Sequence, residues 1–329
     1  MLPAVNAIFG FCDIRDFTFA TEGLQQDVML FVNKIAEITH KYVVESGGAP
    51  NKNIGDAFLL VWKLNSDMDS PGETSAGKGD LQKDIFDSAL FAFLRILRDI
   101  KKMGNLAAFL EEADENAAWR STLEDFRVHM GFGLHCGWAI EGSIGSEVKV
   151  DASYLSPHVN LASRLEAATK QFRVPILMSD VFVKGLTGGT QSSCRRVDSV
   201  TFKGSSEPMH IYHFDTEPFE AMMHKPHNYE QLFEATEWLK EEDAVRAGLD
   251  IKDIARMLDN TKEVVVRQVY EMAFRAYTDG DWEKCKYVFH MWIEKFPGDI
   301  LAQVLVGRLM GLGFVLPVDW QGYHSLSEK

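Results

Sequence analysis

The chain has 329 residues, of which 46% are hydrophobic and 25% are charged, a balance typical of soluble globular proteins. Its formal net charge of −14 argues against nonspecific nucleic-acid binding, and the sequence contains no apolar run of about 18 residues that predicts a membrane-spanning helix. The 4 cysteines show no paired spacing, which favours buried thiols in a reducing compartment over zinc ligands or disulfides.

The first predicted element is a strand over residues 5–12, which leads into Asp13. Helical spacing predicts a helix over 25–44, ended by two glycines, and a turn then leads into the strand that carries Asp56. This order predicts an α+β domain in which helices cover one face of an antiparallel sheet. Two carboxylates at the edges of neighbouring strands are a donor set that suits Mg²⁺ and chemistry on nucleotide phosphates.

Residues 66–80 are rich in Ser, Gly and Asp, so we expect a surface loop there. Within this stretch, Gly72 to Lys78 resembles a phosphate-binding loop, but Gly79 stands where a Ser or Thr should hold Mg²⁺. Because no apolar strand leads into it, we interpret it as an ordinary loop. Apolar residues at helical spacing then predict a helix over 81–126.

A strand is predicted from Val128 into the segment around His135, followed by a glycine-marked hairpin. We interpret His135 as a satisfied interior group, since no second ligand or partner acid accompanies it. The next helix is expected to begin with Ser156 as N-cap and Pro157 at its first position. On this helix Asn160 and Arg164 stand four residues apart, which places both on one face.

From about Pro218 onward the sequence predicts acidic amphipathic helices, so we divide the chain into domains at 1–215 and 216–329. Within Tyr270 to Val306 the spacing of aromatic and small residues resembles one tetratricopeptide-type helical hairpin. One such unit cannot bury its own apolar face. It is therefore expected either to complete the fold as an extension or to bind a protein partner.

Three runs, 8–18, 52–62 and 159–166, occur in the order in which the catalytic domains of class III nucleotidyl cyclases carry their motifs. Over residues 5–214 the chain resembles this family. The resemblance implies a ferredoxin-like α+β domain on the cytoplasmic side of the cell. It also implies conversion of a nucleoside triphosphate into the 3′,5′-cyclic monophosphate and pyrophosphate, with two Mg²⁺ or Mn²⁺ ions in each active site.

The resemblance also implies roles for individual residues. Asp13, Asp56 and the Ile14 carbonyl correspond to the family's metal ligands. Asn160 corresponds to the residue that orients the ribose. Arg164 corresponds to the residue that stabilises charge at the α-phosphate, and a guanidinium suits this role because its fork matches phosphate oxygens.

Further matched positions concern the substrate. Lys52 and Ser153 correspond to the base-reading residues, and a cation with a hydroxyl can recognise adenine, whereas guanine presents a ring N–H for which Lys52 offers no acceptor. ATP is therefore expected in preference to GTP, with a guanylyl cyclase as the alternative. Lys203 matches a lysine that contacts the triphosphate, and the resemblance adds Phe17 to the substrate-binding set.

The chain departs from the family where most members carry Gly-Asp-Thr before Val-Asn, since it has Ser156-Pro157-His158 instead. Family sites form between two catalytic domains, and this chain carries the whole residue set, so a head-to-tail homodimer with two equivalent sites is expected. Two other hypotheses remain open. The chain could be a catalytically inactive nucleotide-binding or regulatory subunit, or an interaction module that acts through its C-terminal helices.

Overall fold

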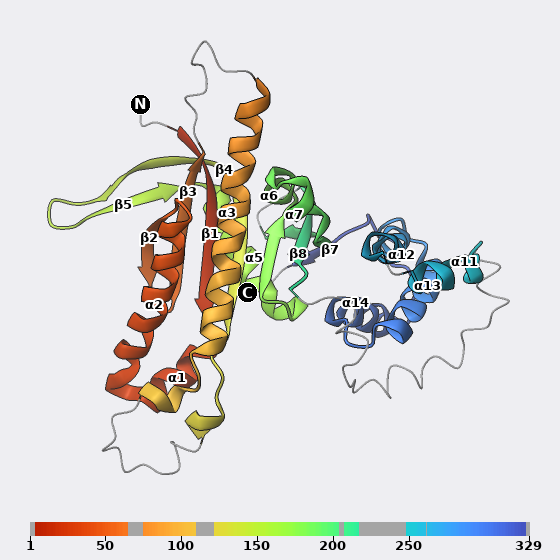
Figure 1. Ribbon diagram of the computed structural model, residues 1–329, viewed down its shortest axis with the longest axis horizontal. Helices are drawn as coiled ribbons and strands as arrows, with labels where there is room; N and C mark the ends of the chain where they lie inside the picture. Colours follow the sequence, from red (N-terminus) through yellow and green to blue (C-terminus); the bar gives the residue numbers. More distant parts are fainter. Residues whose placement is uncertain are drawn as a thin grey trace. The chain divides into compact units, whose positions relative to one another are not determined.

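A computed structural model describes residues 4–64, 75–109, 122–203, 207–216, 248–260 and 262–326, with the backbone alone over 75–82. The chain forms two compact units (Figure 1). The first comprises Met1–Lys170 and Pro175–Gln191, and the second comprises Gln171–Val174 and Ser192–Glu328.

The first unit is built on a mixed β-sheet whose strands run in the order β2-β3-β1-β4-β6, with β5 paired to β4. All neighbours within this unit are antiparallel except β4 and β6, which are parallel. The strands are β1 Ala4–Ile14, β2 Ala49–Ile54, β3 Ala57–Leu64, β4 Met130–Gly145, β5 Val150–Leu155 and β6 Ile176–Ser179. The expected α+β class is confirmed.

The helices of the first unit lie on both faces of this sheet, not on one as the sequence analysis expected. On one face α3 contributes Phe93, whose ring lies 5.9 Å from that of Trp62 and 4.8 Å from that of Phe132. On the opposite face Ala162 of α5 joins a buried cluster that includes Phe9. The helices are α1 Phe17–Leu24, α2 Val28–Glu45, α3 Ser75–Lys102, α5 Pro157–Phe172, α6 Asp180–Gly185 and α7 Gly188–Ser192.

Three helix boundaries differ from the sequence-based expectation. The helix expected over 25–44 begins at Val28 and is preceded by a short 3-10 turn, and α1 was not expected. Helix α3 begins inside the stretch 66–80 that was expected to be a loop, because an established helix extends cheaply by one residue at a time. It ends at Lys102 and does not continue to 126, since Gly104 takes a φ of 87°. Residues 65–74 lie outside the described residues, and so does the start of the phosphate-loop-like stretch, whose later part from Ser75 onward belongs to α3.

The second unit combines a small sheet with four helices in the described part of the chain. Strand β7 Cys194–Phe202 pairs antiparallel with β8 Met209–Phe214 and parallel with β9 His324–Leu326. The helices are α11 Ile251–Leu258, α12 Glu263–Thr278, α13 Trp282–Lys295 and α14 Ile300–Gly311. The helical hairpin expected between Tyr270 and Val306 is present, and its turn contains Gly280 with a φ of 82°.

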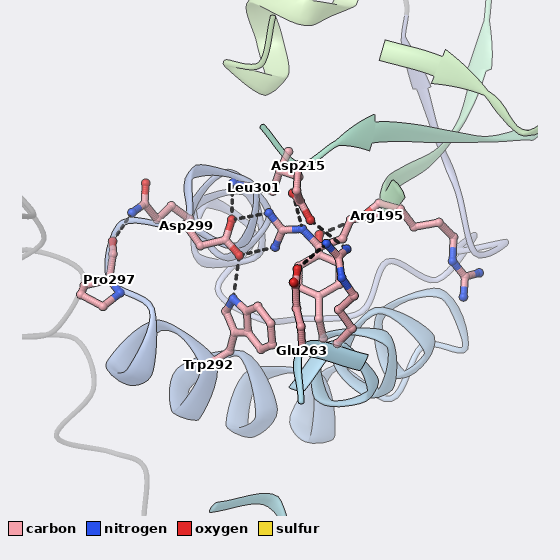
Figure 2. Close-up of polar contacts among 11 residues, drawn as sticks. Arg195, Asp215, Glu263, Trp292, Pro297, Asp299 and Leu301 are labelled. Carbon is pink, nitrogen blue, oxygen red and sulfur yellow. Dashed lines mark hydrogen bonds and ion pairs between the residues drawn. The ribbon is translucent and has the colours of Figure 1, made fainter. Parts of the chain in front are cut away.

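A buried arginine joins β7 to these helices (Figure 2). Arg195 donates from Nε to Asp215 at 2.9 Å and from Nη2 to Asp299 at 3.1 Å. Asp299 also accepts a hydrogen bond from the Trp292 indole at 2.6 Å and caps α14 through the Leu301 backbone N–H. A buried charged or polar group without a partner is costly, so these paired groups hold the helices against the strand.

The helices that the structure describes are all too short or too polar to cross a bilayer.

Candidate active site

Asp13 and Asp56 lie side by side at one edge of the first unit's sheet. Asp13 is close to the end of β1 and pairs in register with Ala57, the first residue of β3. Asp56 occupies the turn between β2 and β3, and its carbonyl accepts a hydrogen bond of 3.3 Å from the Ile14 N–H. Gly55 allows this tight turn because it takes a φ of 65°. The structure therefore brings together the two aspartates expected to bind metal, with Ile14 directly beside them.

The electrostatics of this edge suit a divalent cation. Burial raises the pKa of the Asp13 carboxyl, and the adjacent Asp56 raises it further, both by charge and by a hydrogen bond between the two side chains. A cation between two such carboxyls relieves their repulsion, and two carboxylates with a backbone carbonyl are the hard oxygen donors that Mg²⁺ and Mn²⁺ prefer. The described residues contain no group of three or more His, Cys, Asp or Glu arranged for metal binding. A cation held here would need further ligands from phosphate and water, as Mg²⁺ commonly does.

An arginine that the sequence analysis missed connects this edge to helix α5. One guanidinium nitrogen of Arg15 lies 2.6 Å from a carboxylate oxygen of Glu166 and donates to the Glu166 carbonyl at 3.1 Å and to Thr169. Its other terminal nitrogen lies 3.9 Å from Asp13. Burial raises the pKa of Glu166 to about 7, although Arg15 opposes the shift. A Cβ at Gly131 would lie 1.6 Å from the guanidinium, so this glycine provides the space.

Helix α5 lies directly against β4, because that strand carries glycines on the face that the helix covers. A Cβ on Gly133 would lie 2.2 Å from the Ala162 carbonyl and 2.5 Å from the Glu166 nitrogen. Ala162 and Leu165 on the helix are fully buried, whereas Asn160 is exposed on the side away from the strand. As expected, α5 begins at Pro157, and Ser156 caps it by accepting from the His158 N–H at 3.0 Å.

The two expected base-reading residues lie on β2 and β5, which approach each other. Lys52 is half-buried just after a register shift in the β2–β3 ladder, and Ser153 is buried opposite Gly142 of β4. The residue after Ser153, Tyr154, donates to Glu141 at 2.8 Å. Ser153 therefore belongs to the β4–β5 ladder, and not to the altered segment 156–158.

The last two candidates lie elsewhere. Phe17 is half-buried at the first position of α1, four residues after Asp13. Lys203 is exposed, follows β7 and belongs to the second unit.

Within one chain, Asp13 and Asn160 do not meet. Asp13 pairs with Gly131 of β4, whereas His158, at the start of α5, covers Gly137 of the same strand. Six residues of strand span about 20 Å, and two residues of helix recover only about 3 Å of this. Asn160 also faces away from β4, so the expected metal ligands and the expected ribose-orienting residue lie on the order of 15 Å apart.

A comparison with known protein families shows to which family the chain belongs. A model of the adenylate and guanylate cyclase catalytic domain matches residues 4–216. The chain belongs to this family. The resemblance found in the sequence motifs is thereby confirmed.

Several cyclases are similar to this chain. An adenylate cyclase from Anabaena cylindrica is 28% identical over 204 residues, which are 61% of this chain and 35% of that protein. The terminal-differentiation-specific adenylate cyclase of Dictyostelium discoideum is 32% identical over 207 residues, or 61% of this chain and 8% of that protein. The chain thus matches only a minor part of these relatives' length. The crystal structure of the adenylyl cyclase CyaB from P. aeruginosa shares the fold, with a TM-score of 0.51 and 22% identity over 66% of this chain and 97% of that one.

Proposed function

We propose that this cyclase-family chain is an adenylyl cyclase, which converts ATP into 3′,5′-cyclic AMP and pyrophosphate. The observation that carries the proposal is that the carboxyls of Asp13 and Asp56 lie next to each other where β1 ends and β3 begins, partly exposed and beside Ile14. Two bound Mg²⁺ or Mn²⁺ ions would supply an activated ribose 3′-oxygen and neutralise the pyrophosphate leaving group.

The chain's own residues divide the remaining work. Asp13 and Asp56 hold the cations and so position the triphosphate, while Asn160 orients the ribose. The Arg164 guanidinium stabilises the charge that develops on the α-phosphate. By analogy with oxyanion donors, removal of Arg164 is expected to raise the barrier by about 3 to 4 kcal/mol.

The preference for ATP rests on Lys52 and Ser153. Their strands approach each other, so the Lys52 ammonium can donate to N1 of adenine while the buried Ser153 hydroxyl accepts from its exocyclic amine. The ring N–H of guanine would face Lys52 without an acceptor, which disfavours the guanylyl alternative. Both curated relatives described above carry the name adenylate cyclase, in agreement with this preference.

We propose that the active unit is a head-to-tail homodimer. Asp13 and Asn160 of one chain lie on the order of 15 Å apart, which favours a site in which the two residues come from different copies. The β4–β5 hairpin also exposes apolar side chains, from 43% exposure at Ile144 to 95% at Val148. Surfaces of this kind favour burial against a partner.

The catalytic domain is proposed to span 1–215, which the family match over 4–216 supports. The segment 216–329 is proposed as a tetratricopeptide-like extension. In the described residues its helices pack with β7 and β8 in one compact unit, which favours completion of the fold over partner binding. The buried thiols and the need for ATP fit the cytoplasmic side of the cell.

Turnover tests the proposal directly. The purified chain with Mn²⁺ or Mg²⁺ is expected to release cyclic AMP from ATP, at a higher kcat/KM than cyclic GMP from GTP. Asp13→Ala and Arg164→Ala are expected to abolish release while the protein stays folded. A folded wild-type chain that binds nucleotide and releases no cyclic product with either substrate would support the inactive regulatory subunit instead.

A further inference from the structure

The segment 156–158, in which this chain departs from its family, contains a histidine whose ring packs against defined partners. The ring of His158, the second residue of α5, stacks on that of His135 with a centroid distance of 5.0 Å and an interplanar angle of 24°. His158 Nδ1 lies 2.8 Å from His135 Nε2, and His135 Nδ1 lies 2.7 Å from Ser179 Oγ. Ser179 in turn caps α6 by accepting from the Phe182 N–H. A continuous polar chain therefore joins the start of α5, strand β4 and the start of α6.

The strand leaves space for this ring. An added Cβ on Gly137 would have His158 ring atoms as its three nearest neighbours, at 2.3, 2.5 and 2.6 Å. Trp138 contacts the same ring edge-on at a centroid distance of 5.9 Å. His158 is half-buried here. Its imidazole thus fills a site shaped by one glycine and one aromatic residue, and does not lie loosely on the surface.

The orientation of His158 fixes the orientation of Asn160. Residues two apart on an α-helix are rotated by about 200°, so a first turn that directs His158 onto β4 directs Asn160 to the opposite side. Asn160 is indeed exposed. Because α5 has only one residue before His158, no earlier turn of the helix holds this end against the strand. The contact with His135 therefore sets the rotation and the distance of the first turn, together with the hydrogen bond that the Ser156 hydroxyl donates to the Trp138 carbonyl at 2.5 Å.

We propose that His158 is a positioning residue for Asn160. Its contact with His135 holds the first turn of α5 so that the Asn160 amide is presented to the ribose of a nucleotide bound by the partner copy. This inference rests on the proposed cyclase function. It gives the altered segment 156–158 a role, since the His158 ring stacks on that of His135 on β4 and so holds the start of α5 in place.

Steady-state kinetics on the full chain test this role. His158→Ala is expected to lower kcat by about 10-fold or more with KM for ATP changed less than about 2-fold, because the ribose is misaligned while the triphosphate contacts remain. Gly137→Ala is expected to lower kcat similarly, since its Cβ displaces the ring. In the His158→Ala background, Gly137→Ala should add less than about 2-fold, because the ring that it displaces is gone.

Two controls separate positioning from general damage. His290→Ala on α13 and Gly188→Ala, whose Cβ would meet nothing within 4 Å, should leave kcat unchanged. In an Asn160→Ala background, His158→Ala should cost less than about 2-fold, whereas a merely structural loss would be the same in both backgrounds. The inference is overturned if His158→Ala keeps kcat within about 2-fold, or if Gly137→Ala is equally damaging with and without the ring. A wild-type chain without any cyclase activity would instead refute the proposed function.

Discussion

The guanidinium of Arg15 and the carboxylate of Glu166 lie 2.6 Å apart, with side chains only 13% and 5% exposed. Arg15 follows the end of β1 that carries Asp13, and Glu166 follows Arg164 on α5. In the proposed homodimer these two elements of one chain serve two different active sites. The ion pair therefore joins the metal-binding part of one site to the catalytic helix of the other.

Gly131→Ala is expected to break this connection. Its Cβ would lie 1.6 Å from the Arg15 guanidinium and would force the side chain out of its buried position. Loss of a buried ion pair costs about 3 kcal/mol, so the free energy of unfolding measured with urea should fall by about that amount. Gly188→Ala, with open space around its Cβ, is the matched control and should change little. Equal unfolding free energies for the two variants would contradict the role given to Arg15.

This connection shows where sequence-based prediction stops. The strand-end aspartates and the capped start of α5 are local patterns, so they were predictable from neighbouring residues. Arg15 and Glu166 are separated by 151 positions, and nothing near either residue indicates the other. The sequence does show that something packs closely on β4, because Gly131 and Gly133 lie on the same face of this strand and leave that face without side chains. Such a bare strand face indicates a close approach of another element without identifying it.

The end of α3 and the partners of His135 were also not predictable from the local sequence. Apolar spacing located α3 but not its end, because a single glycine at 104 with positive φ stops the helix while helical-looking residues continue. Likewise, His135 was expected to be a satisfied interior group, and its partners are Ser179 and His158. The partners themselves depend on the packing of α5 and α6 against β4, which local sequence does not specify.

Base preference should respond to Lys52 and Ser153 together. The double variant Lys52→Glu with Ser153→Cys provides an acceptor for the guanine ring N–H and removes the cation that reads adenine. The ratio of kcat/KM for GTP to that for ATP is expected to rise by about 10-fold or more. Lys34→Glu, on the exposed surface of α2, is the charge-matched control. An unchanged ratio in the double variant would show that these residues do not read the base.

The stability of the first unit should depend on pH through His135. Burial lowers the pKa of His135 to about 4, and the neighbouring His158 contributes, while Asp180 opposes the shift. The unfolded histidine titrates near its ordinary value of about 6.5, so the unfolded state takes up the proton first as pH falls. This contribution to stability is complete above pH 6.5 and is lost between pH 6.5 and 4, to a total of about 3 kcal/mol.

Urea unfolding at a series of pH values measures this loss. The wild type should lose more unfolding free energy across that interval than His135→Gln, whose side chain does not titrate. His129→Ala, which removes an exposed histidine and retains His135, should follow the wild type. Parallel pH profiles for the wild type and His135→Gln would contradict the assignment.

The second unit should depend on Asp299. Its carboxylate pairs with Arg195, accepts from the Trp292 indole and caps α14, so Asp299→Ala removes the acceptor of the indole N–H, the cap of α14 and one of the carboxylates that pair with the buried arginine. A loss of about 3 to 5 kcal/mol is expected, followed by tryptophan fluorescence during denaturation. Asp259→Ala removes an ion pair with Lys295 whose carboxylate is 70% exposed, and should cost less than about 1 kcal/mol. Similar losses in both variants would argue against the buried network as the anchor of these helices.

A mixture of two inactive variants tests most directly whether each active site is shared between two copies of the chain. Asp13→Ala lacks a metal ligand and Arg164→Ala lacks the guanidinium, so a heterodimer of the two has one site with both defects and one intact site. If subunits exchange at random, half of the dimers are mixed and the mixture should recover about 25% of wild-type cyclic AMP production. A mixture that stays as inactive as its components, although the chains exchange and the wild type is active, would contradict a site shared between two copies.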